Sequence, residues 1–254
     1  MSCAVAAPKA GTGKVFLTLP GLSVKPVTPI MAAVAAQQHA FLENGYTLVL
    51  LDVRTNVPEG YSIREMAEDT AAVMRALGIT RADVFGASMG GMRAAELAIA
   101  HPELVDHLIL GSTSLRHAEG SDRQFRHWID LARKKDERGL LSACGRAIYS
   151  PAAWAANGEA FLNASSPVTD EEYTRFIRTA SALFGMDALD RVTGISAGTL
   201  VIASRGDKVF TAGPSEEIVR ALGCESYFYG EEYGHGVYDE APDYAQRLFD
   251  FCRR

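Results

Sequence analysis

The fold is decided by the stretch Ala82-Asp-Val-Phe-Gly-Ala-Ser-Met-Gly-Gly-Met-Arg-Ala-Ala-Glu-Leu-Ala-Ile-Ala-His101, in which a short apolar run meets a helix-favouring run at one serine. Gly86 and Gly90 stand two places before and after Ser88, as a sharp strand-to-helix turn requires where backbone must pass without Cβ clashes. Ser88 then lies at a helix start, where the first N–H groups lack partners and favour negative charge. Residue type, turn and electrostatics together predict Ser88 as a catalytic nucleophile.

A second stretch, Gly194-Ile-Ser196-Ala-Gly198, fits the same G-x-S-x-G pattern. It stands before an apolar run (residues 199–203) instead of after one, and no helix-favouring run follows it. A nucleophile at a strand-to-helix turn needs the strand first and the helix second. We therefore interpret Ser196 as a loop residue.

Composition indicates one large α/β core. The chain has 254 residues, of which 48% are hydrophobic, and a net charge of −6, which argues against nucleic acid or an anionic membrane as partner. No apolar run approaches the ~20 residues of a membrane span. The start of the chain lacks a signal-peptide pattern, so we expect a cytoplasmic protein. We expect no metal, because the four cysteines lack metal-ligand spacing, and we also expect no cofactor. The cysteines are Cys3, Cys144, Cys224 and Cys252.

Strands and helices are predicted to alternate through most of the chain. After a loose lead-in over residues 1–14, apolar runs predict strands, and residues with apolar spacings of three and four predict helices. Ser62 with Glu65 has the spacing of a capping box at one helix start. Such alternation implies parallel strands joined by right-handed crossovers. The expected strands are 15–19, 46–53, 83–87, 105–110, 199–204 and 225–229, and the expected helices are 28–44, 63–77, 89–100, 214–222 and 241–252.

The alternation stops between residues 115 and 194. This segment predicts helices only, at about 121–136, 139–148, 152–163 and 169–184. We interpret it as a helical lid inserted over the sheet edge from which Ser88 projects, with 1–114 and 195–254 forming the core. The segment carries Trp128 and Trp154, which are candidates for the substrate-binding wall or, alternatively, for the interior of the lid.

A serine hydroxyl needs a base to take its proton, and the base needs an acid to hold it in one tautomer. Asp207 follows the strand at 199–204, and His235 follows the strand at 225–229 between Gly234 and Gly236. These glycines are expected to leave the imidazole mobile enough to reach a neighbouring loop. The other five histidines fall within helices or at element ends and are interpreted as surface or packing residues: His39, His101, His107, His117 and His127.

Asp52 also ends a predicted strand, but Arg54 stands two residues on, so we expect a structural ion pair between them.

The negative oxygen that forms when Ser88 attacks a carbonyl needs two backbone donors. Met89 N–H is expected to supply one from the turn. Leu22 N–H, in the loop after the first predicted strand, is the candidate for the other.

Together these residues resemble the α/β-hydrolase fold family, whose members use a nucleophile, an acid and a histidine in that chain order. Ser88, Asp207 and His235 match this order, as does a helical lid after the sixth family strand. Residues 86–92 with 101–105 are similar to the esterase, lactonase and carbon–carbon hydrolase branch. The resemblance implies a mostly parallel sheet of about six strands, because the short lead-in leaves the N-terminal hairpin reduced or missing.

Two departures from that family accompany the match. Pro20-Gly21 stands where relatives carry His-Gly in the oxyanion loop, and residues 55–60 replace the usual glycine-rich turn. The function implied is a serine hydrolase that cleaves a small-molecule ester, thioester or lactone through an acyl-enzyme on Ser88. Two alternatives stay open: a ligand-binding receptor or scaffold with little turnover, and an acyltransferase or lyase that uses the same site.

Overall fold

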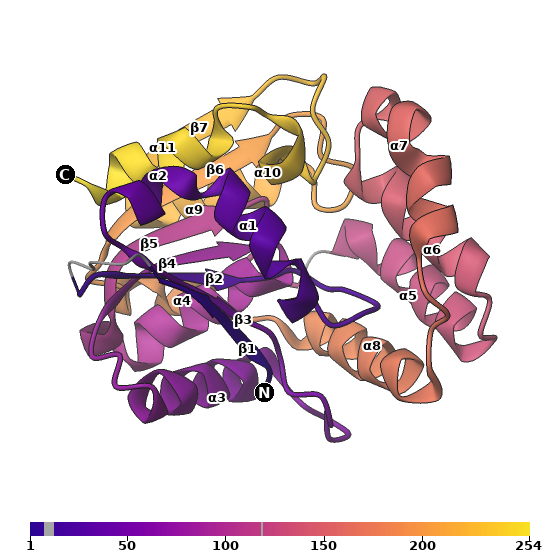
Figure 1. Ribbon diagram of the computed structural model, residues 1–254, viewed down its shortest axis with the longest axis horizontal. Coiled ribbons are helices and arrows are strands. Elements are labelled where there is room, and N and C mark those ends of the chain that lie inside the picture. Colours follow the sequence, from indigo (N-terminus) through magenta and orange to yellow (C-terminus); the bar gives the residue numbers. More distant parts are fainter. Residues whose placement is uncertain (8–12, 118) are drawn as a thin grey trace.

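A seven-stranded sheet forms the centre of the protein, in the order β1-β3-β2-β4-β5-β6-β7 (Figure 1). The computed structural model describes residues 1–7, 13–117 and 119–254. All neighbouring strands are parallel except β1, which pairs with β3 antiparallel. The strands are β1 (Cys3–Ala6), β2 (Val15–Leu19), β3 (Thr47–Leu51), β4 (Ala82–Ala87), β5 (Val105–Gly111), β6 (Gly198–Ser204) and β7 (Glu225–Tyr229).

The strand at the beginning of the chain corrects the expectation of a loose lead-in. Cys3 lies opposite Leu51 and Ala6 opposite Leu48, so β1 extends the sheet by one short antiparallel strand. Its four residues alternate between exposed and half-buried. This strand brings the sheet to seven strands, one more than the expected six. The rest of the expected lead-in includes residues 8–12, which lie outside the described residues.

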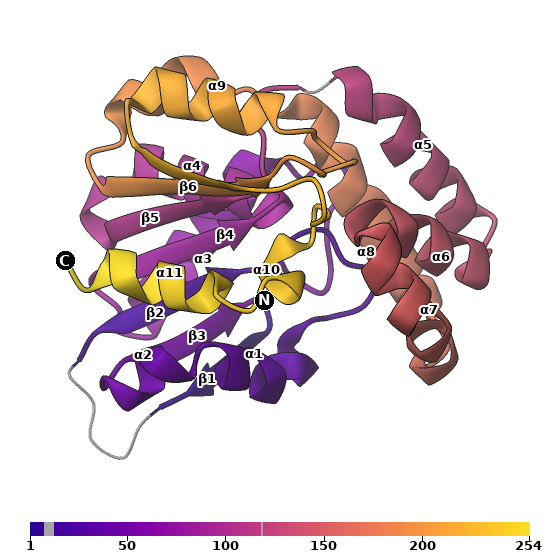
Figure 2. The same cartoon turned by 90° about the horizontal axis from the view of Figure 1, so that it is seen from above.

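Helices cover both faces of the sheet. On one face α1, α2 and α11 pack over Phe16, Phe85 and Ile109, and on the other α3, α4 and α9 pack over Val84 and Leu108 (Figure 2). The helices are α1 (Met31–Gln37), α2 (His39–Glu43), α3 (Ile63–Ala76), α4 (Met89–Ala100), α5 (Glu119–Arg133), α6 (Glu137–Ile148), α7 (Pro151–Ala164), α8 (Asp170–Ala182), α9 (Gly213–Leu222), α10 (Val237–Glu240) and α11 (Tyr244–Cys252). Short 3-10 turns lie at Thr28–Ile30, Pro102–Leu104, Leu183–Gly185 and Leu189–Gly194.

One predicted helix differs in detail from the structure, and the predicted cap of another is confirmed. The expected helix over residues 28–44 is divided at Gln38 into a 3-10 turn, α1 and α2. The Gln38 side chain turns inward and donates from Nε2 to the Thr18 hydroxyl at 3.2 Å. The expected capping box is present at the start of α3, where Ser62 accepts from Glu65 N–H and Glu65 accepts from Ser62 N–H. This box satisfies N–H groups that have no partner within the helix.

Four helices, α5 to α8, occupy the chain between β5 and β6 and group beyond one end of the sheet (Figure 2). α5 packs on α6 and α8, and α6 packs on α7. A buried ion pair joins this group to the sheet: Arg175 of α8 donates to the Asp52 carboxylate after β3. The expected pairing of Asp52 with Arg54 is therefore wrong, and Arg54 instead binds Asp69. Within the described residues, no helix is long and apolar enough to span a membrane.

Candidate active site

The turn at Ser88 joins β4 to α4 and holds its backbone in a strained conformation. Ser88 has φ 56° and ψ −121°, a region that non-glycine residues rarely adopt. Its N–H donates to Gly111 O at 2.8 Å, and its carbonyl accepts from Gly91 N–H at 2.9 Å and from the Thr113 hydroxyl at 2.7 Å. The bonds to Gly111 and Thr113 tie the turn to β5 and to the loop after it. The Ser88 side chain is half-buried at the carboxyl edge of the sheet.

The two glycines of the motif are required by close packing. A Cβ on Gly86 would lie 2.2 Å from Gly90 O, and a Cβ on Gly90 would lie 1.9 Å from Leu19 O. Both distances are far below any contact that real Cβ atoms make. Any larger residue at either position would force β2, β4 and α4 apart, so the G-x-S-x-G pattern follows from how the turn is packed.

The loop after β2 lies directly against Ser88. A Cβ on Gly21 would lie 3.2 Å from both Ala87 O and Ser88 Cβ. Leu22, the predicted oxyanion donor, follows in this loop, and Met89, the other predicted donor, is the first residue of α4. The N–H of a first helical residue has no partner within its own helix. Both expected donors therefore belong to segments that adjoin Ser88.

Asp207 and His235 lie together, as predicted. The His235 Nδ1 donates to Asp207 Oδ2 at 2.8 Å, and both side chains are almost fully buried. The other carboxylate oxygen, Asp207 Oδ1, accepts from Val209 N–H at 2.7 Å and from Phe210 N–H at 3.1 Å. With its proton on Nδ1, the imidazole keeps Nε2 as the acceptor. The pair follows β6 and β7, at the same carboxyl edge of the sheet as Ser88.

The glycines on both sides of His235 pack closely against the end of α6, while the imidazole reaches Asp207 in the neighbouring loop. A Cβ on Gly234 would lie 2.5 Å from Ile148 O, and Gly236 N–H donates to the same carbonyl at 2.7 Å. The Phe210 ring lies 5.6 Å from the His235 ring, centroid to centroid, at a steep angle. Both glycines allow the loop after β7 to approach the end of α6. The histidine is thus held between the sheet and the α5–α8 group.

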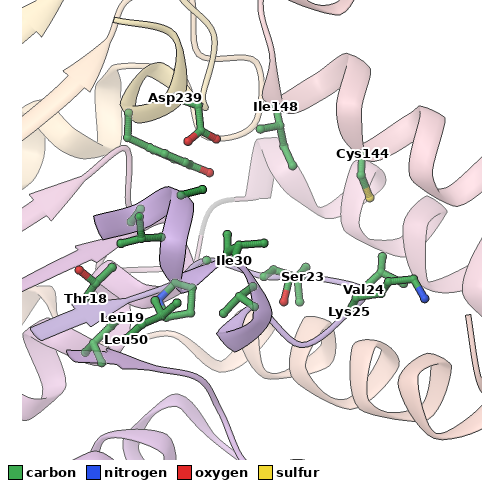
Figure 3. A pocket seen from close by; sticks show the side chains of 18 of the residues that line it. Thr18, Leu19, Ser23, Val24, Lys25, Ile30, Leu50, Cys144, Ile148 and Asp239 are labelled. Carbon is green, nitrogen blue, oxygen red and sulfur yellow. The ribbon is translucent and has the colours of Figure 1, made fainter. Parts of the chain in front are cut away.

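A cavity of about 450 Å³ opens beside the turn. Its lining includes Gly21, Leu22 and Ala87, which adjoin Ser88. Figure 3 shows Thr18 and Leu50 of the sheet on one side of the cavity and Cys144 of α6 on the other. Burial raises the pKa of the Cys144 thiol, so this sulfur stays protonated and is a poor nucleophile. The lining is mostly aliphatic and aromatic, as is typical of small-molecule sites.

The two tryptophans have different surroundings. Trp128 of α5 is 3% exposed and lines the cavity beside the turn. Trp154 of α7 is half-buried, packs against Gly145 and Gly158, and borders a separate hollow with Glu232. Of the two tryptophans, Trp128 alone is among the described residues that line the cavity next to Ser88.

Sequence reasoning missed the polar residues that line the cavity, among them Thr18, Gln38 and Tyr244. Gln38 interrupts an alanine-rich helical pattern, and this interruption is the signal that could have indicated it. Thr18 and Tyr244 lie within apolar patterns and have no comparable signal. The Thr113 hydroxyl, which holds the Ser88 carbonyl, was also missed.

One group of described residues could hold a metal ion, and it lies away from Ser88. The ligand atoms of Asp83, His107 and Cys252 lie within 4.8 Å of one another. Asp83 is at the amino end of β4, whereas Ser88 follows its carboxyl end. Its Oδ1 accepts from His107 Nδ1 at 2.8 Å, so hydrogen bonding already accounts for this contact. Burial raises the pKa of the Asp83 carboxyl.

The parallel sheet, the strained serine turn and the buried aspartate–histidine pair define a class of α/β enzyme folds. The chain belongs to the α/β-hydrolase fold family, whose model matches residues 34–242. A relative from Pseudomonas savastanoi pv. phaseolicola, provisionally named carbamate hydrolase RutD, is 30% identical over 205 residues, which are 77% of this chain and 77% of the relative.

Solved structures share the same fold. An α/β-hydrolase enzyme, MGS-M2, from a Medee basin deep-sea metagenome library superposes with a TM-score of 0.88 at 17% identity, covering 100% of this chain and 94% of the other. The enol-lactonase from Burkholderia xenovorans LB400 superposes with a TM-score of 0.84 at 21% identity, covering 100% and 96%. At these identities the likeness extends to the fold alone.

Proposed function

We propose that the protein is a serine hydrolase that cleaves a small-molecule ester, thioester or lactone through an acyl-enzyme on Ser88. One observation supports this above the others: the strained serine turn lies at the sheet edge that also carries the buried Asp207–His235 pair. Strain held by several backbone contacts is typical of positions that matter for function. The relative's name adds carbamates to the substrates worth assaying.

In the first half of the reaction Ser88 Oγ attacks the carbonyl carbon while His235 Nε2 takes the hydroxyl proton. Asp207 holds the imidazole in the required tautomer and stabilises the imidazolium that forms. The N–H groups of Met89 and Leu22 are the proposed donors to the negative oxygen. When the bond to the leaving alcohol or thiol breaks, His235 gives its proton to the leaving group and the acyl-enzyme remains.

In the second half His235 takes a proton from water, and the resulting hydroxide attacks the acyl carbon. The tetrahedral oxygen again faces Met89 and Leu22. Its collapse breaks the bond to Ser88 Oγ, which recovers its proton from His235. The carboxylic acid is released, and one water has been consumed for each ester cleaved.

We further propose that residues 115–194 act as the lid of this site, with 1–114 and 195–254 as the hydrolase core. The proposal is supported by the cavity, because α5, α6, α7 and α8 all contribute lining residues. α8 attaches the proposed lid to the core, because Arg175 binds Asp52 and Arg178 donates to Val57 O. Trp128 is the proposed apolar wall for the acyl group.

The test is hydrolysis of p-nitrophenyl acetate by the wild-type protein and by Ser88→Ala, with melting curves for both. We expect turnover in the wild type and its loss in the folded variant. A folded wild type without turnover would favour the receptor or scaffold alternative. Addition of an alcohol or thiol acceptor, followed by a search for the transfer product, tests the acyltransferase alternative.

A further inference from the structure

The end of α6 and the start of α7 lie against the loop that carries His235. This part of the proposed lid is residues 148–150, whereas the histidine loop follows β7 in the core. Gly236 N–H donates to Ile148 O at 2.7 Å, and a Cβ on Gly234 would lie 2.5 Å from the same oxygen. The proposed lid therefore contacts the backbone on both sides of the histidine.

A single carboxylate oxygen joins the two segments a second time. Glu240 Oε1, on α10, accepts from Gly234 N–H at 3.2 Å and from Ser150 N–H at 3.0 Å. Gly234 directly precedes His235, and the Ser150 hydroxyl caps the start of α7 by accepting from Ala153 N–H at 3.2 Å. α10 lies on the side of the core that faces α7 (Figure 1). One atom of Glu240 thus bonds both the start of α7 and the histidine loop.

The two N–H groups depend on this oxygen. Ser150 and Gly234 are both buried, so their N–H groups need an acceptor within the protein. Glu240 is half-buried and has no ion pair with a described residue, so the two N–H bonds are what offsets the burial of its charge. Bonds from N–H groups to a carboxylate are stronger than bonds between neutral groups.

The part of the loop before Gly234 is held by the core instead. The Ser204 hydroxyl, at the end of β6, donates to Tyr233 O at 2.6 Å. The His235 ring is also held from the core, through its bond to Asp207. The histidine therefore lies where the loop passes from core contacts to contacts with the proposed lid and Glu240.

The neighbouring acid of α10 makes different contacts. Asp239 accepts from the Tyr149 hydroxyl at 3.1 Å and from Gln37 Nε2 of α1 at 3.3 Å. Figure 3 shows Asp239 of α10 and Ile148 of α6 on neighbouring elements beside the cavity. Asp239 thus links the proposed lid to α1. Of these two acids, Glu240 is the one whose bonds include the histidine loop.

We propose that Glu240 is a positioning residue for His235, which couples the place of the start of α7 to the placement of the imidazole. Because one oxygen serves both N–H groups, loss of that oxygen releases the histidine loop and the start of α7 together. A displacement of about 1 Å can lower the rate of an enzyme by roughly a hundredfold. The inference rests on the proposed function for the role of His235 as the base.

The kinetic test compares substitutions that keep or remove the acceptor oxygen. On p-nitrophenyl acetate we expect Glu240→Ala to lower kcat about tenfold or more with KM within about twofold, because the nucleophile and the cavity are unchanged. Glu240→Gln keeps an acceptor oxygen at the same reach and should recover most of the loss. Glu240→Asp keeps the charge on a shorter side chain and should lower kcat, so it carries the same test if the alanine variant does not fold.

A matched control removes another carboxylate from the same loop. Glu231 is exposed, and its carboxylate makes no hydrogen bond with a described residue. Glu231→Ala should therefore keep the wild-type kcat. Melting curves of all variants show which of them are folded at the assay temperature.

Proton NMR of Ser88→Ala gives a readout that needs no turnover. The His235 Nδ1 proton, bonded to Asp207, is expected as a downfield resonance in this background. It should persist when Glu240→Gln is added and broaden or disappear when Glu240→Ala is added to a protein that stays folded. Wild-type kcat in folded Glu240→Ala or Glu240→Asp, an equal loss in Glu240→Gln, a resonance absent from the background, or one unchanged by Glu240→Ala would overturn the inference. A folded wild type without turnover contradicts the proposed function instead, and the resonance then tests the positioning of His235 by itself.

Discussion

Two stretches of this chain share the pattern G-x-S-x-G, and the structure treats them in opposite ways. At Ser88 both glycines are packed against backbone, and the serine is strained between β4 and α4. At Ser196 the serine is exposed in the loop before β6, and a Cβ on Gly194 would meet no described atom within 4 Å. A short motif therefore indicates a nucleophile only where the backbone around it requires each of its residues.

Ser196 lies before the amino end of β6, whereas Asp207 lies after its carboxyl end, at the edge that carries Ser88. Asp207→Asn should give the largest effect, since an amide can donate to His235 and favour the wrong tautomer. In serine proteases this exchange lowers kcat by about ten-thousand-fold, equal to ~5 kcal/mol of barrier. We expect at least a hundredfold loss of kcat on p-nitrophenyl acetate, with an unchanged melting temperature.

Asp52→Asn is the matched control for that exchange, because Asp52 also ends a strand and is also buried. It binds Arg175, so the variant leaves a buried cation unpaired. We expect a lower melting temperature without a comparable loss of kcat. If Asp207→Asn stayed within about tenfold of the wild type, the acid would lie elsewhere.

The next largest effect is expected when glycines of the two motifs are replaced, because the two replacements should change the free energy of unfolding differently. Gly90→Ala places a Cβ 1.9 Å from Leu19 O, and we expect it to lower the free energy of unfolding by about 3 kcal/mol or to prevent folding. Gly194→Ala should leave that free energy unchanged or raise it by up to about 1 kcal/mol. Urea denaturation of both variants measures the difference. A Gly90→Ala variant as stable as the wild type would contradict the packing described for the turn.

The smallest expected effect concerns the two tryptophans. Trp128→Phe should shift the preference among p-nitrophenyl esters of different acyl length by up to about tenfold, because Trp128 lines the cavity. Trp154→Phe should lower the melting temperature through its lost packing on Gly145 and Gly158 and leave the preference unchanged. Kinetics on acetate, butyrate and octanoate esters distinguish them. Equal shifts in both variants would mean that Trp128 acts only through the packing of the lid.

Much of the fold could be predicted because strands and helices follow local patterns. The apolar runs located β2 to β7, and the capping box located the start of α3. β1 could not be predicted in this way, since its four small residues become a strand only by pairing with the edge of β3. The break at Gln38 depends likewise on its bond to Thr18, which no local pattern shows.

The candidate site was also predictable only where its features follow local sequence patterns. The order of Ser88, Asp207 and His235 was predictable because each follows a strand at the carboxyl edge, where parallel strands place ligand sites. The partner of Asp52 was not, because Arg175 is 123 residues away in the chain. The close packing of Gly234 and Gly236 against Ile148 O also required the position of α6 to be known.

The central claim is that Ser88, and not Ser196, is the nucleophile. The most direct measurement is fluorophosphonate labelling of the wild type, Ser88→Ala and Ser196→Ala, followed by mass spectrometry of the peptides. The account predicts an adduct on Ser88 in the wild type and in Ser196→Ala, and no adduct in Ser88→Ala. An adduct on Ser196, an adduct that persists in Ser88→Ala, or a folded wild type that takes no label would contradict it.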